Sequence, residues 1–188
     1  MLSKYTGLTF RAMGTNIKYK NGFYGDGILS KFPIEYSANY LSPLTNIAHE
    51  QRGILCNKIS FGNTKINVFS LHMSTFEEER ILTAKELIRI VAKVNKNEPI
   101  IIGGDFNVGI KKIGNHKYLY DPKASYPEYE ILKTKFKNIN NSEITWRSKE
   151  ANACIDSFFY SKHLQLLKQE TIKTDISDHY PIYAEFLI

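Results

Sequence analysis

A short apolar run that ends in two glycines and an acid constrains the fold of this chain most. Residues 100–102 are all isoleucine, and Gly103, Gly104, Asp105, Phe106 and Asn107 follow directly. A strand without polar residues is typical of a strand buried on both faces of its sheet. The two glycines permit a sharp exit from this strand, which would leave a carboxylate and an amide close together at its end. The run therefore predicts a core strand that delivers polar groups to one edge of a sheet.

The rest of the chain predicts more strands than helices. We expect strands near residues 26–32, 52–60, 65–72, 144–146, 153–160, 164–173 and 181–188. A Gly62-Asn63 pair lies between the second and third of these, which is a hairpin signal. The mixture predicts layered α and β structure rather than a simple βαβ repeat.

Two helices are expected between the strands. Residues 76–95 carry apolar side chains at helical spacing. Thr75 and Glu78 have the spacing of a capping box at the start of this helix. A second, shorter helix is expected over residues 129–137.

Composition sets limits on the class of protein. The 188 residues predict one soluble domain over residues 1–188, with 43% hydrophobic and 23% charged residues. No apolar run has the length of a membrane helix, and the first ten residues do not resemble a signal peptide, so we expect a cytoplasmic protein without a membrane partner. The net charge of +6 is compatible with a polyanionic substrate. Cys56 and Cys154 lack any metal-binding spacing and are expected to be buried free thiols.

Several polar residues at strand ends are candidates for chemistry. Asp105 and Asn107 could hold a nucleophilic water and a phosphate oxygen, although an Asx turn closing the strand would also explain them. Asp178-His179 offers an oxygen ligand for Mg²⁺ and an imidazole for proton transfer. Asp156 is an acid inside an apolar strand and should have a specific partner, for which His179 is our candidate. His72 ends another strand, where packing alone would also explain it.

These candidates occur in an order that resembles a known superfamily. The motifs Leu-His, Gly-Asp-Phe-Asn, Ile-Asp-Ser-Phe-Phe and Ser-Asp-His-Tyr-Pro occupy residues 71–72, 104–107, 155–159 and 177–181. Their order is similar to that of the endonuclease/exonuclease/phosphatase superfamily. Residues 27–34 and 50–53 also resemble segments of that superfamily. The resemblance therefore covers nearly the whole chain.

The resemblance implies both a fold and an activity. The implied fold is an α/β (α+β) four-layer α/β/β/α sandwich, in which two packed, mainly antiparallel sheets are flanked by helices and the site lies at one end. The implied activity is metal-dependent, nuclease-like phosphodiester hydrolysis with Mg²⁺, or Mn²⁺ as a substitute, on nucleic acid or another phosphodiester. A phosphomonoesterase for a small phosphorylated substrate, and a phosphate-binding domain without turnover, are the alternatives.

The resemblance also implies catalytic roles for five residues. Asp105 would activate or orient the attacking water, and Asn107 would steady water and phosphate. His179 would stabilise the charge that develops on the phosphate, with Asp156 as its orienting partner. His72 would contact the phosphate or the leaving group.

Three further positions receive roles from the resemblance. Asp178 would be a metal ligand together with Asp105 and Asn107. Arg52 would lie close to the phosphate, like His72 and Asn107, or in the network that supports it, although a surface arginine on a strand would also explain it. Asp26 would be a polar residue that orients His72.

One part of the superfamily pattern is missing from the sequence. We find neither the early strand with an Asn nor the Gln-Glu pair whose glutamate is the principal metal ligand, and residues 1–21 resemble the variable region that follows it. The chain would then be a fragment, a natural short form without turnover, or an enzyme with a substitute acid such as Glu50 or Glu35. A sheet without these strands would expose an edge, so we also expect self-association through that edge.

Overall fold

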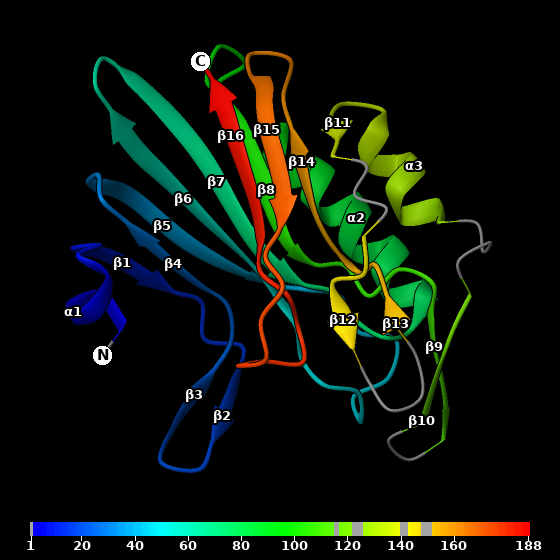
Figure 1. The fold of residues 1–188 in the computed structure, drawn as a ribbon. Helices are drawn as coiled ribbons and strands as arrows, with labels where there is room; N and C mark the ends of the chain where they lie inside the picture. Colours follow the sequence, from blue (N-terminus) through cyan, green and yellow to red (C-terminus); the bar gives the residue numbers. More distant parts are fainter. Residues whose placement is uncertain (1, 115–116, 122–125, 140–142, 148–151) are drawn as a thin grey trace.

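A six-stranded sheet forms the centre of the computed structural model, which describes residues 2–114, 117–121, 126–139, 143–147 and 152–188 (Figure 1). From one edge to the other, the strands are β11 (Lys137–Asn138), β14 (Asp156–Tyr160), β8 (Ile100–Asp105), β7 (Thr64–His72), β6 (Gly53–Phe61) and β5 (Ile34–Leu41). Neighbours run antiparallel except for β7 and β8, which are parallel. The parallel pair requires a crossover, and the helix between these two strands supplies it.

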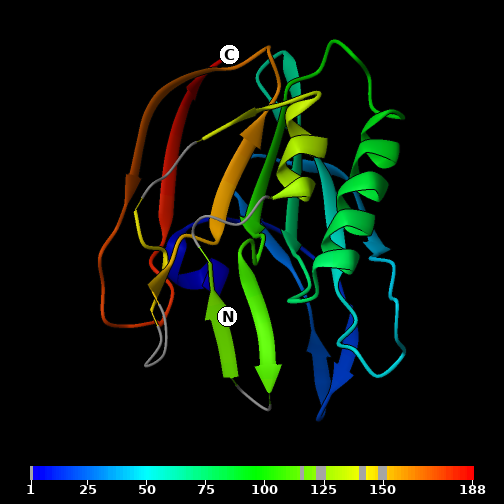
Figure 2. The same ribbon diagram turned by 90° about the vertical axis from the view of Figure 1, so that its right-hand side faces the viewer.

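Helices α2 (Glu77–Val91) and α3 (Pro127–Lys133) cover one face of this sheet, as Figure 2 shows from the side. Ile100 and Ile102 of β8 belong to the buried cluster beneath them, together with Leu87 of α2. Ile101 instead packs in a second cluster on the opposite face, with Leu164. The isoleucine run is therefore covered on both faces, as its composition predicts.

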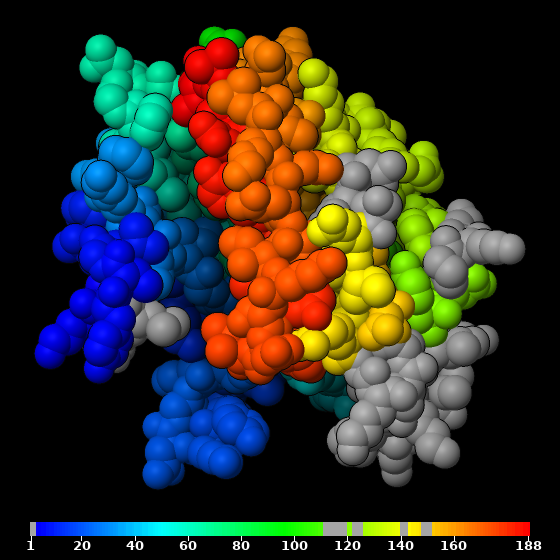
Figure 3. Space-filling model, in the orientation of Figure 1, coloured from blue at the N-terminus to red at the C-terminus, as the bar shows by residue number. Residues whose placement is uncertain are grey.

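The opposite face carries two separate antiparallel strand pairs. One pair is β1 (Phe10–Met13) with β4 (Gly27–Ser30), next to the short helix α1 (Leu2–Thr6), and the other is β15 (Gln165–Thr171) with β16 (Ile182–Leu187). Figure 3 shows this face, with the first pair in blue and the second in red and orange, and with more distant strands visible between them. Among the described residues no strand joins the two pairs, so each of these four strands keeps one open edge.

Three short hairpins complete the fold. They are β2 (Ile17–Tyr19) with β3 (Gly22–Tyr24), β9 (Ile110–Gly114) with β10 (Lys117–Tyr120), and β12 (Trp146–Arg147) with β13 (Asn152–Ala153). The first two hairpins extend beyond the same end of the sheet (Figure 1). The resulting arrangement is the mixed α and β layering that the sequence predicts.

Several local predictions are confirmed and others are wrong. The Gly62-Asn63 turn joins β6 to β7, and Gly62 has a φ of 57°. The capping box is wrong, because the N-cap of α2 is Phe76 and no side chain caps it. The Phe76 amide instead donates to Ser74 Oγ at 3.2 Å.

Other differences concern the bounds of elements. Helix α3 begins and ends earlier than the predicted helix at 129–137, because Pro127 occupies its first turn. The strand expected at 153–160 is interrupted between β13 and β14, and β5 was not predicted. Cys56 is a buried free thiol, whereas Cys154 is only partly buried and forms no disulfide with it. In the described part of the chain, no helix has both the length and the apolar character that a membrane crossing requires.

Candidate active site

Three neighbouring strands bring polar side chains to one end of the central sheet. His72 ends β7, Asp105 ends β8, and Asp156 begins β14. The strand register places Asp105 opposite both His72 and Asp156. Residues far apart in the sequence therefore meet because they occupy matching positions on adjacent strands.

The glycine before Asp105 is required by the packing of these strands. Gly104 has a φ of 151°, and a Cβ atom built there would lie 1.8 Å from the carbonyl oxygen of Leu71. Any side chain at this position would push β7 away from β8. Gly103 is also constrained, since its Cβ would lie 2.6 Å from the ring of Phe158. The glycine pair thus allows the close approach that sets Asp105 beside its neighbours.

His179 joins this group from the segment between β15 and β16. Its Nδ1 lies 2.9 Å from Asp156 Oδ2, which is the partnership expected from the sequence. Burial is the largest single influence on the pKa of His179 and lowers it, but the hydrogen bond to Asp156 and the charges of Asp156, Asp105 and Asp178 together outweigh burial, so the pKa is raised. The contact uses Nδ1 and leaves Nε2 as the ring nitrogen that can serve a substrate.

Asp105, Asp156 and His179 form a group that could hold a cation. Each offers one ligand atom, and these atoms lie within 4.8 Å of one another. Two carboxylates with one imidazole suit a divalent ion. Asn107 lies beside them with a φ of 50°, and its Nδ2 donates to the carbonyl oxygen of Met73 at 2.9 Å. Its Oδ1 is therefore the end of the amide left to act as an oxygen ligand.

The Asx turn considered for the Asp105 motif is also present. The backbone amide of Asn107 donates to Asp105 Oδ1 at 2.8 Å. The turn holds the Asp105 carboxylate in place relative to Asn107. A turn that closes the strand and a site that holds water and phosphate are therefore compatible with the same geometry.

Arg52 and His72 form a hydrogen-bonded chain that ends on Asp105. Arg52 Nη1 lies 2.7 Å from His72 Nδ1, and His72 Nε2 lies 3.2 Å from Asp105 Oδ2. A guanidinium can only donate, so Nδ1 must accept and the proton of a neutral ring must lie on Nε2. Arg52 also pairs with Glu50 at 3.0 Å. Its guanidinium therefore contacts protein groups of the site, which fits the supporting network that the resemblance offered for Arg52 beside a direct phosphate contact.

Asp26 lies at the edge of the hydrogen-bonded series formed by Arg52, His72 and Asp105. It is next to two asparagines that no sequence motif indicated. Asn16 Nδ2 donates to Asp26 Oδ2 at 3.1 Å, and Asn39 Nδ2 donates to Asn16 Oδ1 at 3.0 Å. Burial raises the pKa of Asp26, while the hydrogen bond from Asn16 and the charges of His72 and Arg52 partly offset that rise. Asn16 lies between β1 and β2 and Asn39 lies in β5, and no local pattern marks either of them.

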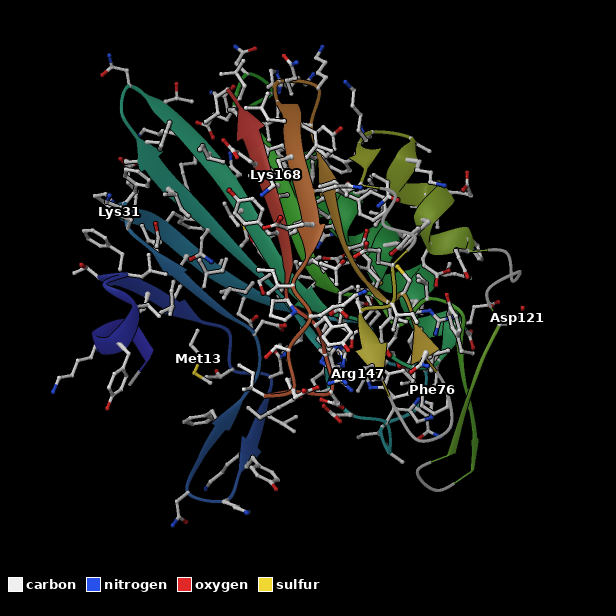
Figure 4. The ribbon with its side chains drawn as sticks, viewed as in Figure 1. Met13, Lys31, Phe76, Asp121, Arg147 and Lys168 are labelled. Atoms are coloured by element: carbon white, nitrogen blue, oxygen red, sulfur yellow. The ribbon has the colours of Figure 1, made fainter. Side chains whose placement is uncertain are left out.

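Asp178 lies apart from the group that could share an ion. Its side chain is exposed, and its Oδ2 accepts a hydrogen bond from Trp146 Nε1 at 3.3 Å. The next residue, Arg147, stacks over the ring of Tyr180 at 4.4 Å and donates its amide to the carbonyl oxygen of Asp178 at 2.8 Å. Figure 4 labels Arg147, the last residue of β12. Asp178 therefore acts on His179 through its charge in this arrangement.

Neither glutamate considered as a substitute metal ligand lies in the cluster. Glu35 pairs with Lys65 at 2.5 Å, near the start of β5. Arg52 lies at the opposite end, since Leu41 at the end of β5 pairs with Gly53. Glu50 contacts Arg52, whose guanidinium in turn contacts His72.

A buried carboxylate behind the cluster fixes the loop that carries Arg52. Glu79 of α2 accepts from the Thr45 amide at 2.9 Å, Thr45 Oγ1 at 3.0 Å, His49 at 2.7 Å and Ser74 Oγ at 2.6 Å. Its side chain is 1% exposed. Burial alone would raise the pKa of Glu79, but these hydrogen bonds lower it to about 2. From the sequence, Glu79 was expected only to be one of the acidic residues in the first turn of the helix.

Comparisons with known proteins show the family of the chain. The model of the Endonuclease/Exonuclease/phosphatase family matches residues 3–179. An uncharacterised protein, YbhP of Escherichia coli strain K12, is 31% identical over 98 residues, and the match covers 51% of this chain and 38% of YbhP. The chain thus matches well under half of the length of that relative.

Solved structures of the same family share the fold. A family member from Bacteroides vulgatus has a TM-score of 0.76 at 17% identity, over 100% of this chain and 79% of that one. A member from Leptotrichia buccalis has a TM-score of 0.71 at 19% identity, covering 100% and 75%. A mannosyl-6-phosphatase from Bacteroides thetaiotaomicron has a TM-score of 0.71 at 15% identity, covering 100% and 80%. With its family-model match over nearly the whole length, this chain belongs to the endonuclease/exonuclease/phosphatase family.

Proposed function

We propose that this chain is a divalent-metal-dependent phosphodiester hydrolase domain with nuclease-like substrates. The observation that carries the proposal is the meeting of His72, Asp105 and Asp156 on adjacent strand ends, with His179 bound to Asp156 at 2.9 Å. Members of this family generally hydrolyse phosphoester bonds, and the net charge of +6 favours a polyanionic substrate. We place the protein in the cytoplasm as part of the same proposal.

The proposed cation is Mg²⁺, with Mn²⁺ as a substitute. Asp105 and Asn107 supply oxygen donors, and Asp178 would join them only after leaving its contact with Trp146. Asp156 is an alternative third donor, because its carboxylate belongs to the group within 4.8 Å. A bound divalent cation would neutralise charge on the phosphate oxygens.

The side chains themselves would carry out the remaining steps. Asp105 would accept the proton of the attacking water or orient it, since its carboxylate lies at the centre of the cluster. His179 would present Nε2 to the phosphate, and the raised pKa of its ring favours the charged form that stabilises developing negative charge. His72 would donate its Nε2 proton toward Asp105 and hold that carboxylate in place, with Arg52 fixing the tautomer.

Hydrolysis of bis-p-nitrophenyl phosphate and of plasmid DNA tests this proposal. Each substrate is incubated with Mg²⁺ or Mn²⁺ and with the wild-type chain or the Asp105→Asn variant. Asp121→Asn is the matched control, because it removes the same charge from an exposed aspartate that is not part of the cluster and lies at the right-hand side of the view in Figure 4. Metal-dependent turnover that Asp105→Asn abolishes and Asp121→Asn retains is the expected result. Equal rates for all three chains, or no turnover by any, would overturn the proposal.

A phosphomonoesterase is a second candidate. The structural similarity to a mannosyl-6-phosphatase favours including it, although at 15% identity that similarity concerns the fold alone. Parallel assays with p-nitrophenyl phosphate and a sugar 6-phosphate distinguish the two functions. Faster turnover of the monoesters than of the diester would favour the phosphomonoesterase.

We also propose that copies of the chain associate through an open strand edge. β16 pairs only with β15 in the described structure, and its exposed side chains include Tyr183 and Leu187. Such edges favour pairing with another chain. Sedimentation velocity at rising protein concentration should show dimers in the wild type and fewer in a Leu187→Lys variant. A monomer at every concentration would contradict this expectation.

A further inference from the structure

Thr145 lies between the two segments that carry Asp156 and His179. It directly precedes β12, and it is completely buried, with 0% of its surface exposed. Its backbone amide donates to the carbonyl oxygen of Ala153 at 2.9 Å. Neither the motifs nor the family resemblance gives this residue a role.

The hydroxyl of Thr145 holds a bend in the chain immediately before Asp156. Its Oγ1 accepts the backbone amides of both Ile155 and Asp156, each at 3.0 Å. Consecutive amides of a regular strand point to opposite sides, so two that converge on one oxygen require a local bend. The carbonyl oxygen of Ile155 meanwhile accepts the Phe106 amide at 2.8 Å, which ties the bend to the turn that follows Asp105.

The backbone of the same residue holds the segment that carries His179. The Tyr180 amide donates to the carbonyl oxygen of Thr145 at 2.6 Å. The next residue along, Trp146, forms a backbone bridge with His179. One buried residue thus contacts the chain at Asp156 and at the neighbour of His179, on two segments that are separate in the sequence.

We propose that Thr145 is a positioning residue that sets the contact between Asp156 and His179. Its effect on catalysis rests on the proposed hydrolytic function, whereas its effect on the geometry of the pair does not. A hydroxyl oxygen has two lone pairs, one for each amide. A valine has nearly the same shape but no acceptor, so it would leave the buried amide of Ile155 and the partly buried amide of Asp156 without this partner. The chain would then relax at the bend and carry the Asp156 carboxylate away from His179.

Matched substitutions separate the hydroxyl from the packing. Thr145→Val removes the acceptor, and Thr145→Ser retains it. Thr83→Val is the control, because Thr83 is 1% exposed on α2 and its Oγ1 has no hydrogen-bond partner among the described residues. Thr83→Val therefore also removes a buried hydroxyl, but this hydroxyl accepts no hydrogen bond from a backbone amide among the described residues.

The first readout does not depend on activity. The Nδ1 proton of a histidine bound to a carboxylate gives a downfield NMR signal, and we expect that signal for His179 in the wild type, Thr145→Ser and Thr83→Val. It should disappear or move in Thr145→Val. An unchanged signal in Thr145→Val would overturn the proposal, even if no form of the chain hydrolyses any substrate.

The second readout is kinetic. We expect kcat of Thr145→Val to fall by at least about tenfold with KM nearly unchanged, and Thr145→Ser to recover most of that loss, because the substrate contacts stay while the catalytic pair is displaced. Equal losses in Thr145→Val and Thr83→Val would assign the effect to packing and overturn the proposal. Should Thr145→Val fail to fold, amide hydrogen exchange in the wild-type chain tests whether the two hydrogen bonds to Thr145 Oγ1 form. Slow exchange at Ile155 and Asp156 supports the two hydrogen bonds, and exchange as fast as in an exposed loop contradicts them.

Discussion

The buried carboxylate of Glu79 offers a quantitative test of how the loop before Arg52 is held. Glu79→Gln keeps the shape of the side chain and removes its charge. The pKa of this carboxylate falls from the ordinary value of 4.5 to about 2, so the charged form contributes about 3 kcal/mol to the stability of the folded state. The glutamine variant should lose much of this contribution at neutral pH.

The pH dependence of this loss follows from the sign of the change. A pKa that is lower in the folded state gives stability that is complete above the unfolded value of 4.5 and is lost as the pH falls toward about 2. The difference in unfolding free energy between the wild type and Glu79→Gln should therefore shrink by about 2 kcal/mol between about pH 6 and about pH 3.

Urea unfolding followed by circular dichroism at several pH values measures this difference. Glu78→Gln is the matched control, because Glu78 lies in the same helical turn and its side chain is exposed. The control should differ from the wild type by less than about 0.5 kcal/mol at every pH. A difference for Glu79→Gln that stays constant across this range would refute the link between its hydrogen bonds and its pKa.

Three further substitutions test the catalytic pair and the packing around it. Asp156→Asn should lower the pKa of His179 in an NMR titration without metal, and a pKa that stays raised would contradict this. A pKa that is raised in the folded state contributes stability at low pH, and this contribution is lost as the pH rises through the folded-state pKa. The variant should therefore be more destabilised in acid than in alkali. Gly104→Ala should lower the unfolding free energy by at least about 2 kcal/mol, because its Cβ would meet the carbonyl oxygen of Leu71; a neutral effect in urea unfolding would show that β7 and β8 can separate. Asn57→Leu should raise the unfolding free energy by about 1 kcal/mol, because the Asn57 side chain is 0% exposed and neither amide atom has a partner among the described residues; a loss of stability would contradict this account.

The sequence predicted those parts of the fold whose signals are local. The isoleucine run, the Gly62-Asn63 turn and the periodic helix each depend on residues close in the chain, and β8, the hairpin and α2 follow from them. The capping box failed because Glu79, rather than Glu78, turns inward and binds Ser74. Sequence spacing alone does not determine which of several adjacent glutamates finds a buried partner.

The site was predictable only at positions where the residue is unusual for its surroundings, such as a carboxylate in an apolar strand. Asp156 in an apolar strand required a partner, and His179 is in contact with it. Asn16 and Asn39 carry no such signal, because asparagines are common in turns and their contact depends on strands that meet only in the folded chain. Arg52 was expected near the phosphate or in its supporting network, but its particular partners, Glu50 and His72, depend on the path of a loop.

The division of the outer layer into two strand pairs has a consequence for how the molecule loses its order. His179 follows β15, which packs through a small cluster around Leu164, while Asp105 and His72 belong to the main sheet and its larger core. Regions with few buried apolar contacts open at lower free energy than the global transition. The β15–β16 pair could therefore detach while the central sheet stays intact, separating His179 from Asp156. Loss of the catalytic pair on heating would then precede the melting of the sheet, and refolding would restore it as the last step.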